Sequence, residues 1–251
     1  MDGRIEVAGL AQRFASPIPV DVLAGLDLVV GEHEFASLIG PSGCGKSTVL
    51  RVLAGLLVPS AGSASIGGQP AIGRPGLAAF MPQRDTLLPW RRALANATLG
   101  AEVAGVDRAQ ARAAALALFE RFGLAGFERA WPAQLSGGMR QRVALLRTLL
   151  AGRPALLLDE PLGALDAMTR RELQTWLAAL LSTEPRTTLL VTHDVDEALL
   201  LSDRVHVLSP RPATLRDSID VPFERPRSPG LVTHPTFVQL KARVLDALEA
   251  R

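Results

Sequence analysis

The sequence has no tyrosine, a single cysteine and no long apolar run. One cysteine excludes an internal disulfide, as is usual for proteins of a reducing compartment. The longest uncharged segment, residues 52–73, is interrupted by Pro59 and Pro70, so we expect no membrane-spanning helix. Charged residues stand at positions 2, 4 and 6, where a secretory signal peptide needs an apolar core, so we expect no such signal.

The chain also lacks a large net charge of either sign. The formal net charge is +2 and 21% of the residues are charged, which argues against a dedicated nucleic-acid binder, because such proteins concentrate positive charge on one face. The chain has 251 residues, of which 48% are hydrophobic. That is enough to bury the core of one large α/β domain, or of one domain with an inserted lobe.

Residues 40–47 match the phosphate-binding pattern G-x-x-x-x-G-K-[ST] without interruption. Residues 34–39 have the pattern of a short strand, and residues 48–57 carry apolar residues at helical spacing. A loop between a strand and a helix start presents backbone N–H groups and the positive end of the helix dipole to an anion. The sequence therefore predicts a nucleotide site made of Gly40, Pro41, Ser42, Gly43, Cys44, Gly45, Lys46, Ser47 and Thr48.

Three side chains of this segment have predicted properties of their own. Lys46 is one of two lysines among 27 basic residues, which suggests that a compact ammonium is needed between phosphate oxygens. Ser47 is expected to place its hydroxyl on Mg²⁺. Cys44 lies near the predicted helix start, where the pKa of a thiol tends to fall, so we expect bound nucleotide to protect it from alkylation.

Two further predicted strands end in residues suited to hydrolysis. The apolar run 155–158 is typical of a strand buried on both faces of a parallel sheet, and Asp159 and Glu160 follow it. Asp159 is suited to hold Mg²⁺ and Glu160 to orient or deprotonate an attacking water; the alternative is that they cap the next helix. The strand 188–191 leads to His193, which is expected at the same sheet edge, although a lone histidine is more often structural.

A second helix start suited to an anion occurs in residues 135–142, with the sequence LSGGMRQR. Ser136 is a natural N-cap, and the two glycines after it clear space at the helix start. Arg140 and Arg142 lie in the first turns, where the helix dipole disfavours cations. Their position is easier to explain if an anion binds there.

The composition changes at Arg84, and from there to about residue 132 the pattern is helical, which predicts a helical lobe inserted between strands. Residues 87–90 form an apolar cluster that either docks a partner or packs the two lobes together. Phe14 either stacks on a base or fills the edge of a small sheet.

Four local expectations complete the prediction. Residues 59–63 should form a turn, and Asp194 and Glu197 a capping-box pair for the helix 195–201. Residues 210–229 are rich in proline and arginine and predict an extended surface strap. Residues 237–248 have an amphipathic stripe that should pack on the body.

Six motifs of the chain resemble the full motif set of an ABC-transporter ATPase subunit, and they occur in the order found in that family. They are Walker A (40–47), the Q-loop (Gln83), the signature (135–142), Walker B (156–161), the D-loop (164–166) and the H-loop (His193). The resemblance covers residues 4 to about 210, and the signature is very specific to this family. It implies an α/β fold: a P-loop NTPase (RecA-like) core with a mainly parallel sheet, an N-terminal antiparallel β subdomain and an inserted α-helical subdomain.

Finer features are similar to one importer branch, which serves nitrate, sulfonate, taurine and related solutes, including thiamine-precursor pyrimidines. These features are the residues 87–90, Met139 and Arg140, the segment 160–166 and the arginine- and proline-rich tail. Two departures from the pattern, at residues 84–85 and at Leu162, concern coupling more than hydrolysis and leave the substrate open.

The resemblance also implies roles for individual residues. Phe14 would stack on adenine, and Gln83 would contact the nucleotide and Mg²⁺. Glu160, His193 and Lys46 would be catalytic, and Mg²⁺ would be held by Ser47, Gln83 and Asp159. Two copies would pair head to tail, so that Ser136, Gly137 and Gly138 of one copy cover the γ-phosphate held by Lys46 of the other. Asp166 would be a further nucleotide-binding residue.

The implied protein is an ATPase at the cytoplasmic face of the membrane, bound to permease subunits through residues 87–92 and served indirectly by a solute-binding protein. We expect one ABC ATPase domain, with its core and β subdomain in residues 1–83 and 155–210, a helical subdomain in 84–154 and a tail in 211–251. The alternative is an ABC-type ATPase that acts on nucleic acid or ribosomes, but such relatives carry long coiled coils or tandem cassettes.

Overall fold

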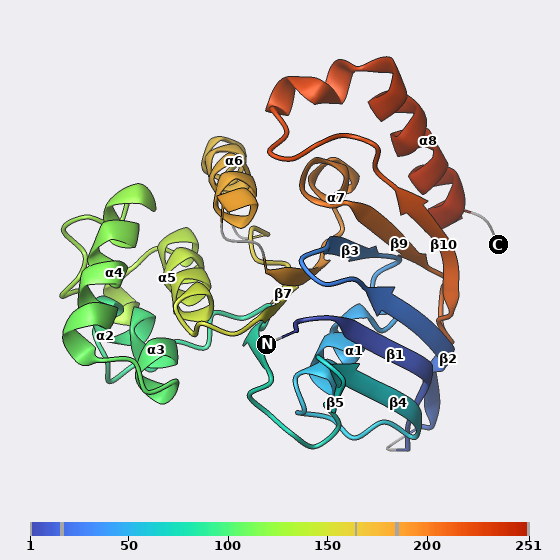
Figure 1. Ribbon diagram of the computed structural model, residues 1–251, viewed down its shortest axis with the longest axis horizontal. Helices are drawn as coiled ribbons and strands as arrows, with labels where there is room; N and C mark the ends of the chain where they lie inside the picture. Colours follow the sequence, from blue (N-terminus) through green and yellow to red (C-terminus); the bar gives the residue numbers. More distant parts are fainter. Residues whose placement is uncertain (1, 16–17, 164, 184–185, 250–251) are drawn as a thin grey trace.

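The computed structural model describes residues 2–15, 18–163, 165–183 and 186–249. The chain forms two lobes, one built on two sheets and one helical, with helix α5 (Gly137–Leu149) on the side of the helical lobe that faces the sheets (Figure 1). No described helix is long and apolar enough to cross a membrane.

The larger sheet has six strands in the order β10-β9-β3-β8-β7-β6. Five of them are parallel, and β10 joins β9 antiparallel at one edge. Each parallel strand comes from a short, mostly apolar run, as expected for strands covered on both faces. The strands are β3 (Phe35–Ile39), β6 (Ala78–Met81), β7 (Ala155–Asp159), β8 (Thr187–Val191), β9 (Arg204–Leu208) and β10 (Leu215–Asp220).

Successive residues of the central strands enter two separate cores. Leu156 and Leu158 of β7 face the core shared with the helical lobe, whereas Leu157 faces the core shared with the second sheet. Strand β8 alternates in the same way at Leu189 and Leu190. Because side chains alternate along a strand, one apolar run holds both lobes against a single sheet.

The smaller sheet is antiparallel, in the order β2-β1-β4-β5. Its strands are β1 (Ile5–Phe14), β2 (Val20–Val30), β4 (Ala61–Ile66) and β5 (Gln69–Pro70). Helix α1 (Lys46–Leu53) packs between the two sheets (Figure 1). The turn predicted at 59–63 is partly wrong, because Ala61 and Ser63 already pair with β1. The small residues there allow the strands to approach, and Gly62 has a φ of 89° that a side chain rarely adopts.

The helical lobe lies between β6 and β7 in the sequence, as predicted. Its helices are α2 (Ala93–Ala97), α3 (Leu99–Val103), α4 (Arg108–Arg121) and α5. Asp107 caps α4 by accepting from the amides of Ala109 and Gln110, and Gly123 follows the helix at a φ of 60°. The mixed α/β architecture with its antiparallel N-terminal sheet and inserted helices agrees with the fold class predicted from the sequence.

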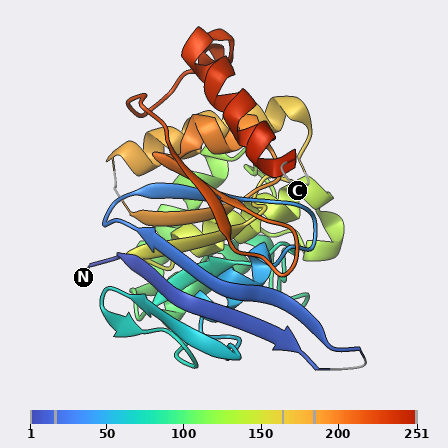
Figure 2. The same ribbon diagram turned by 90° about the vertical axis from the view of Figure 1, so that its right-hand side faces the viewer.

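The C-terminal part of the chain contains more regular structure than predicted. The expected surface strap 210–229 includes β10, whose residues pair with β9 from Leu215 to Asp220. Helix α8 (Pro235–Glu249) then buries Phe237 and Val244 against the body, as the amphipathic stripe predicted (Figure 2).

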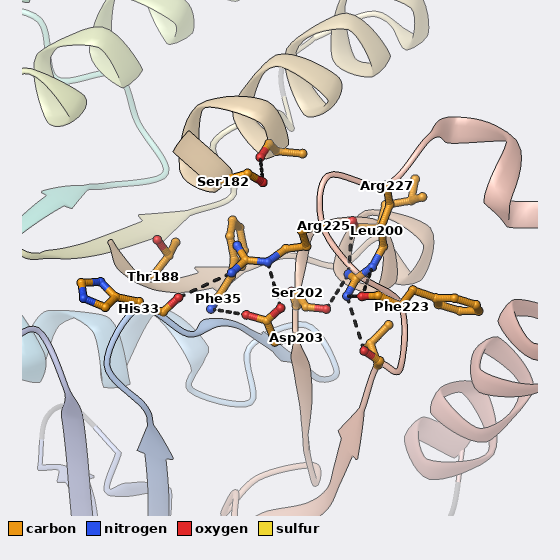
Figure 3. Close-up of polar contacts among 12 residues, drawn as sticks. His33, Phe35, Ser182, Thr188, Leu200, Ser202, Asp203, Phe223, Arg225 and Arg227 are labelled. Atoms are coloured by element: carbon orange, nitrogen blue, oxygen red, sulfur yellow. Dashed lines mark hydrogen bonds and ion pairs between the residues drawn. The ribbon is translucent and has the colours of Figure 1, made fainter. Parts of the chain in front are cut away.

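Arginine side chains fasten the strap to the body (Figure 3). Arg227 is only 6% exposed and donates to the carbonyl oxygens of Leu199 (3.0 Å) and Ser202 (2.6 Å) at the end of helix α7 (Val195–Leu201). Burial lowers the pKa of Arg227 to about 10. Arg225 pairs with Asp203 at 2.8 Å. The expectation of a purely surface strap is therefore wrong, because these carbonyls at a helix end need donors and the strap supplies them.

We predict that His206 on β9 makes stability sensitive to acid. Burial, with the charge of Arg204 second, lowers the pKa of His206 from 6.5 to about 4. The unfolded chain binds this proton near pH 6.5 and the folded chain only near pH 4. His206 therefore contributes about 3 kcal/mol to the free energy of unfolding above pH 6.5, and this contribution is lost as the pH falls to 4.

Chemical denaturation between pH 4 and pH 8 measures this contribution. His206→Gln should flatten the loss of unfolding free energy below pH 6.5, whereas the control His33→Asn, at an exposed histidine, should follow the unmodified protein. Equal pH dependence for all three proteins would contradict the prediction.

Candidate functional site

A cleft of about 710 Å³ opens at the carboxyl ends of β3, β7 and β8, at the boundary between the two sheets. Ligands of open α/β sheets bind at this edge. Most of the residues predicted from the sequence are brought together here. The cleft is lined by Phe14, Ile18, Val20, Val22, Ser42, Gly43, Gly45, Lys46, Ser47, Thr48, Gln83, Glu160, His193 and Arg211.

The phosphate loop connects β3 to α1, as its strand and helix signals predicted. Gly45 has a φ of 120°, and a Cβ added there would lie 2.8 Å from Cγ1 of Val22 on β2. A Cβ added to Gly40 would lie 2.9 Å from the sulfur of Cys44. The two glycines are therefore needed because the loop is pressed against neighbouring atoms on both sides.

Lys46 is 8% exposed, and its ammonium donates to the carbonyl oxygens of Gly40 (2.7 Å) and Pro41 (3.0 Å). Within the described part of the chain, no ion pair to a carboxylate is found for this lysine. Its charge is therefore held inside the loop by neutral carbonyl groups. Such a cation is available to an anion that enters the loop.

Ser47 and Asp159 meet below the loop. The hydroxyl of Ser47 donates to Oδ1 of Asp159 at 3.1 Å, and Asp159 is 3% exposed. Burial raises the pKa of Asp159, and the nearby charge of Glu160 acts in the same direction, whereas the hydrogen bond from Ser47 opposes the shift. An oxygen pair of this kind, one hydroxyl and one carboxylate, suits Mg²⁺, which takes few protein ligands.

Glu160 follows Asp159 with a φ of 48°, an uncommon conformation for a residue other than glycine. Its amide donates to the carbonyl oxygen of Val191 on β8 at 2.9 Å. One carboxylate oxygen accepts from Gln83 at 3.2 Å, and the other lies 3.4 Å from Nδ1 of His193. The backbone thus turns the carboxylate into the cleft between these two side chains.

The alternative role of the two acids as helix caps does not fit the geometry. The next helix, α6 (Ala167–Thr183), is capped by Asp166, whose Oδ1 accepts from the amides of Met168 and Thr169. The hydrogen bonds from Thr169 and from Met168 lower the pKa of Asp166. Asp159 and Glu160 therefore do not cap this helix.

The comparisons with known proteins agree with one another. Residues 23–163 match the family model described as ABC transporter. A relative from Rhodococcus jostii, named aliphatic sulfonates import ATP-binding protein SsuB 1, is 47% identical over 244 residues, which are 97% of this chain and 93% of the relative.

The chain belongs to the ABC transporter family.

A second relative, the formylaminopyrimidine import ATP-binding protein ThiZ of Halalkalibacterium halodurans, is 42% identical over 83% of this chain and 82% of its own length. The solved dimer of the ATP-binding cassette MJ0796 with ADP and Pi superposes with a TM-score of 0.78 and 26% identity, over 88% of this chain and all of the other. The protein is thus an ABC ATPase, an enzyme coupled to transmembrane transport.

The signature segment of this ABC ATPase starts α5, as predicted. Ser136 is the N-cap and accepts from the amide of Met139 at 3.2 Å, and Gly137 and Gly138 open the helix. Within the described chain, these three residues and Asp166 do not line the cleft. Their assignment to a nucleotide site stays a prediction, and Ala164 of the D-loop lies outside the described residues.

Sequence reasoning did not single out Gln141, although it lies inside the signature. Gln141 is buried and donates to the carbonyl oxygen of Glu160 at 3.3 Å. It therefore joins the signature helix to the residue predicted to activate water. Its position three residues before Ala144 and four before Leu145, both apolar and buried, puts it on the buried face of the helix, which is the signal that was available.

Two questions left open by the sequence are answered in part by the fold. Phe14 ends β1, is 40% exposed and lines the cleft, so it occupies both a sheet edge and the candidate base site. In the 87–90 cluster, Leu87 is buried in the core of the helical lobe, whereas Trp90 is 70% exposed. The cluster thus packs inward at one end and faces solvent at the other.

The capping-box prediction for α7 is half right. Asp194 caps the helix by accepting from the amide of Glu197 at 3.0 Å. The carboxylate of Glu197 does not return to Asp194; it accepts from the hydroxyl of Thr192 and from Gln174 of α6. Glu197 is buried, and burial raises its pKa, so this carboxylate uses the donors that are within reach.

The expectation that the thiol of Cys44 has a lowered pKa is wrong. Its side chain is 1% exposed and lies in the core between the two sheets, beneath the loop. Burial raises the pKa of the thiol and outweighs the charge of Lys46, which acts in the opposite direction. Desolvation thus overrides the helix start, and only the backbone of Cys44 remains a candidate for contact with nucleotide.

We therefore predict that Cys44 reacts slowly with iodoacetamide at pH 8 in the native protein, with or without ATP, and rapidly in 6 M guanidinium chloride. Mass spectrometry of time points measures both rates. A native rate close to the denatured one, reduced by nucleotide, would favour the original expectation.

Proposed function

We propose that two copies of this chain bind and hydrolyse ATP between them and thereby drive import of a small solute through a membrane permease. The observation that carries the proposal is the convergence of Lys46, Ser47, Asp159, Glu160 and His193 at one sheet edge. Each of these residues comes from a strand end or a helix start, so the backbone fixes the whole arrangement.

The nucleotide would lie with its base near Phe14 and its phosphates in the loop 40–48. Lys46 would exchange its two carbonyl contacts for phosphate oxygens, which accept a charged hydrogen bond more strongly. Mg²⁺ would be held by Ser47, Asp159 and Gln83, and when bound it neutralises phosphate charge. The contact between Ser47 and Asp159 supports the first two of these ligands.

Glu160 is the proposed general base. Its carboxylate lies in the cleft, accepts a hydrogen bond from Gln83 and contacts the ring of His193. It could therefore hold a water molecule in line with the terminal phosphate and accept a proton from that water. His193 follows β8 and can donate to the terminal phosphate or to the same carboxylate. Both residues act from fixed backbone positions, which reduces the reorganisation needed for reaction.

A second copy supplies what the cleft of one copy lacks. Ser136, Gly137 and Gly138 form an anion-suited helix start, yet they do not line this cleft. We propose that they and Asp166 contact nucleotide bound by another copy in a head-to-tail dimer. The MJ0796 cassette with ADP and Pi is dimeric, which supports the pairing of two copies.

The partner in the membrane would be a permease, which places this subunit at the cytoplasmic face. We propose residues 87–92 as the docking segment, and the exposure of Trp90 beside a buried Leu87 supports it. The relatives are named for import of aliphatic sulfonates and of formylaminopyrimidine, so we propose a sulfonate, taurine, nitrate or pyrimidine-like solute delivered by a binding protein.

Within this proposal the chain is one ABC ATPase domain. Residues 1–83 and 155–210 form the core and β subdomain, 84–154 form the helical subdomain, and 211–251 form the tail. The continuous core between β7 and the helical lobe supports the single domain. Nothing in the site favours the alternative of an ATPase that acts on nucleic acid or ribosomes.

We predict that Glu160→Gln retains ATP binding but loses turnover about 10²- to 10⁴-fold, because the amide cannot accept the proton of water. Phosphate release measures turnover, and size-exclusion chromatography with ATP should detect a trapped dimer. The control Glu120→Gln, on the exposed side of α4, should leave both unchanged. An unaltered rate in Glu160→Gln would remove this residue from the role of base.

We further predict that Trp90→Ser weakens coupling and spares basal hydrolysis, because Trp90 lies outside the nucleotide cleft. The ATPase rate with and without the reconstituted permease measures coupling. Stimulation by the permease should fall about 10-fold, whereas Val103→Ser, at an equally exposed apolar residue of the same lobe, should retain it. Full stimulation of Trp90→Ser would exclude residues 87–92 as a docking segment centred on this ring.

A further inference from the structure

One cation of the cleft comes from a segment that no motif predicted. The connection between β9 and β10, residues 209–214, lies beside β2 (Figure 1). Arg211, in this connection, lines the same cleft as Phe14 and Lys46. The late connection therefore contributes a side chain to a cleft that is otherwise lined by the first two strands, the phosphate loop and residues that follow β6, β7 and β8.

Backbone hydrogen bonds hold the connection in place. At its base, the amide of Ser209 donates to the carbonyl oxygen of Thr214 at 3.0 Å. At Ala213, the amide donates to the carbonyl oxygen of Val22 at 2.9 Å, and the carbonyl oxygen accepts from Ala24 at 3.1 Å. Ala213 is fully buried. The connection is thus closed by the bond between Ser209 and Thr214 and fixed to β2 at Ala213, and neither contact depends on the side chain of Arg211.

The guanidinium of Arg211 lies against the phosphate loop. A Cβ added to Gly43 would lie 3.5 Å from Nη2 of Arg211. Among the residues that the structure describes, none forms a hydrogen bond or ion pair with the Arg211 side chain. Arg243, by contrast, is paired with Asp217 at 2.9 Å. Within the described chain, Arg211 is therefore a cation beside the phosphate loop that no protein carboxylate neutralises.

We propose that Arg211 binds the phosphate chain of the nucleotide, as a second side-chain cation beside Lys46. This rests on the proposed function, which puts nucleotide in the cleft. A guanidinium stays charged at any physiological pH and offers paired N–H groups to two phosphate oxygens. We expect Arg211 to contact the phosphates, because its Nη2 lies next to Gly43 of the phosphate loop. The candidate site for the base is at Phe14, in another part of the cleft.

The experiment compares ADP with adenosine. Calorimetry or competition measures the dissociation constant of each ligand for the unmodified chain and for Arg211→Gln, Arg211→Lys and Arg211→Glu. The control is Arg112→Gln, at an exposed arginine of α4 in the other lobe. Arg211 is exposed and its backbone is held independently, so the variants should keep the melting temperature of the unmodified chain.

We expect ADP to bind roughly 10-fold more weakly to Arg211→Gln, about threefold more weakly to Arg211→Lys and most weakly to Arg211→Glu. Adenosine should bind all variants equally. The KM for ATP should rise in the same order while kcat changes less than about twofold. Added salt should weaken ADP binding more for the unmodified chain than for Arg211→Gln, because one phosphate contact is missing in the variant.

Three results would overturn the inference. ADP affinity could be the same in all variants; adenosine could lose as much affinity as ADP, which would assign Arg211 to the base; or only dimer formation could change, which would assign it to an acidic group of the second copy. If the unmodified chain itself binds neither ADP nor ATP, the proposed function fails, and this outcome is distinct from the other three.

Discussion

The pairing of three parallel strands is the constraint on which the site depends. Strands β3, β8 and β7 are held in register by their backbone hydrogen bonds, and the register pairs Leu38 with Val191 and Val191 with Asp159. This register brings the phosphate loop, Glu160 and His193 to one level at the sheet edge. The hydrogen bond from the amide of Glu160 to Val191 extends the same ladder by one residue beyond β7. A slip of β7 by one residue would turn Asp159 away from Ser47 and reverse which leucines enter each core.

The two cores explain how a site at the sheet edge is linked to the helical lobe. Because β7 and β8 are buried on both faces, the lobe and the antiparallel sheet pack on opposite sides of the same strands. Helix α5 packs against the first side and delivers Gln141 to the carbonyl oxygen of Glu160. The backbone of Glu160 is therefore linked to α5 by this hydrogen bond, and Leu162, two residues later, shares a core with α5. The packing gives the candidate base a direct connection to the lobe that carries Trp90.

The sequence was most informative where chemistry imposes a backbone requirement. The glycines of the phosphate loop, the apolar run before Asp159 and the N-cap Ser136 each predict a local geometry that the fold contains. Tertiary contacts could not be predicted in the same way. Three features depend on elements far away in the chain. They are the burial of Cys44, the inward orientation of the Glu197 carboxylate and the hydrogen bonds from Arg227 to the carbonyl groups at the end of α7. Arg211 illustrates the limit, since its place follows from hydrogen bonds between Ala213 and β2 that no local pattern encodes.

The fastening of the strap by Arg227 has a practical consequence for protein engineering. The guanidinium supplies the donors for carbonyl groups at the end of α7, the helix that begins just after His193. A truncation upstream of residue 227 would remove these donors together with α8, and would expose the apolar residues of α7 that pack with Phe237 and Val244. Affinity tags and fluorescent fusions therefore belong beyond α8, and shortened versions for crystallisation should retain the arginine.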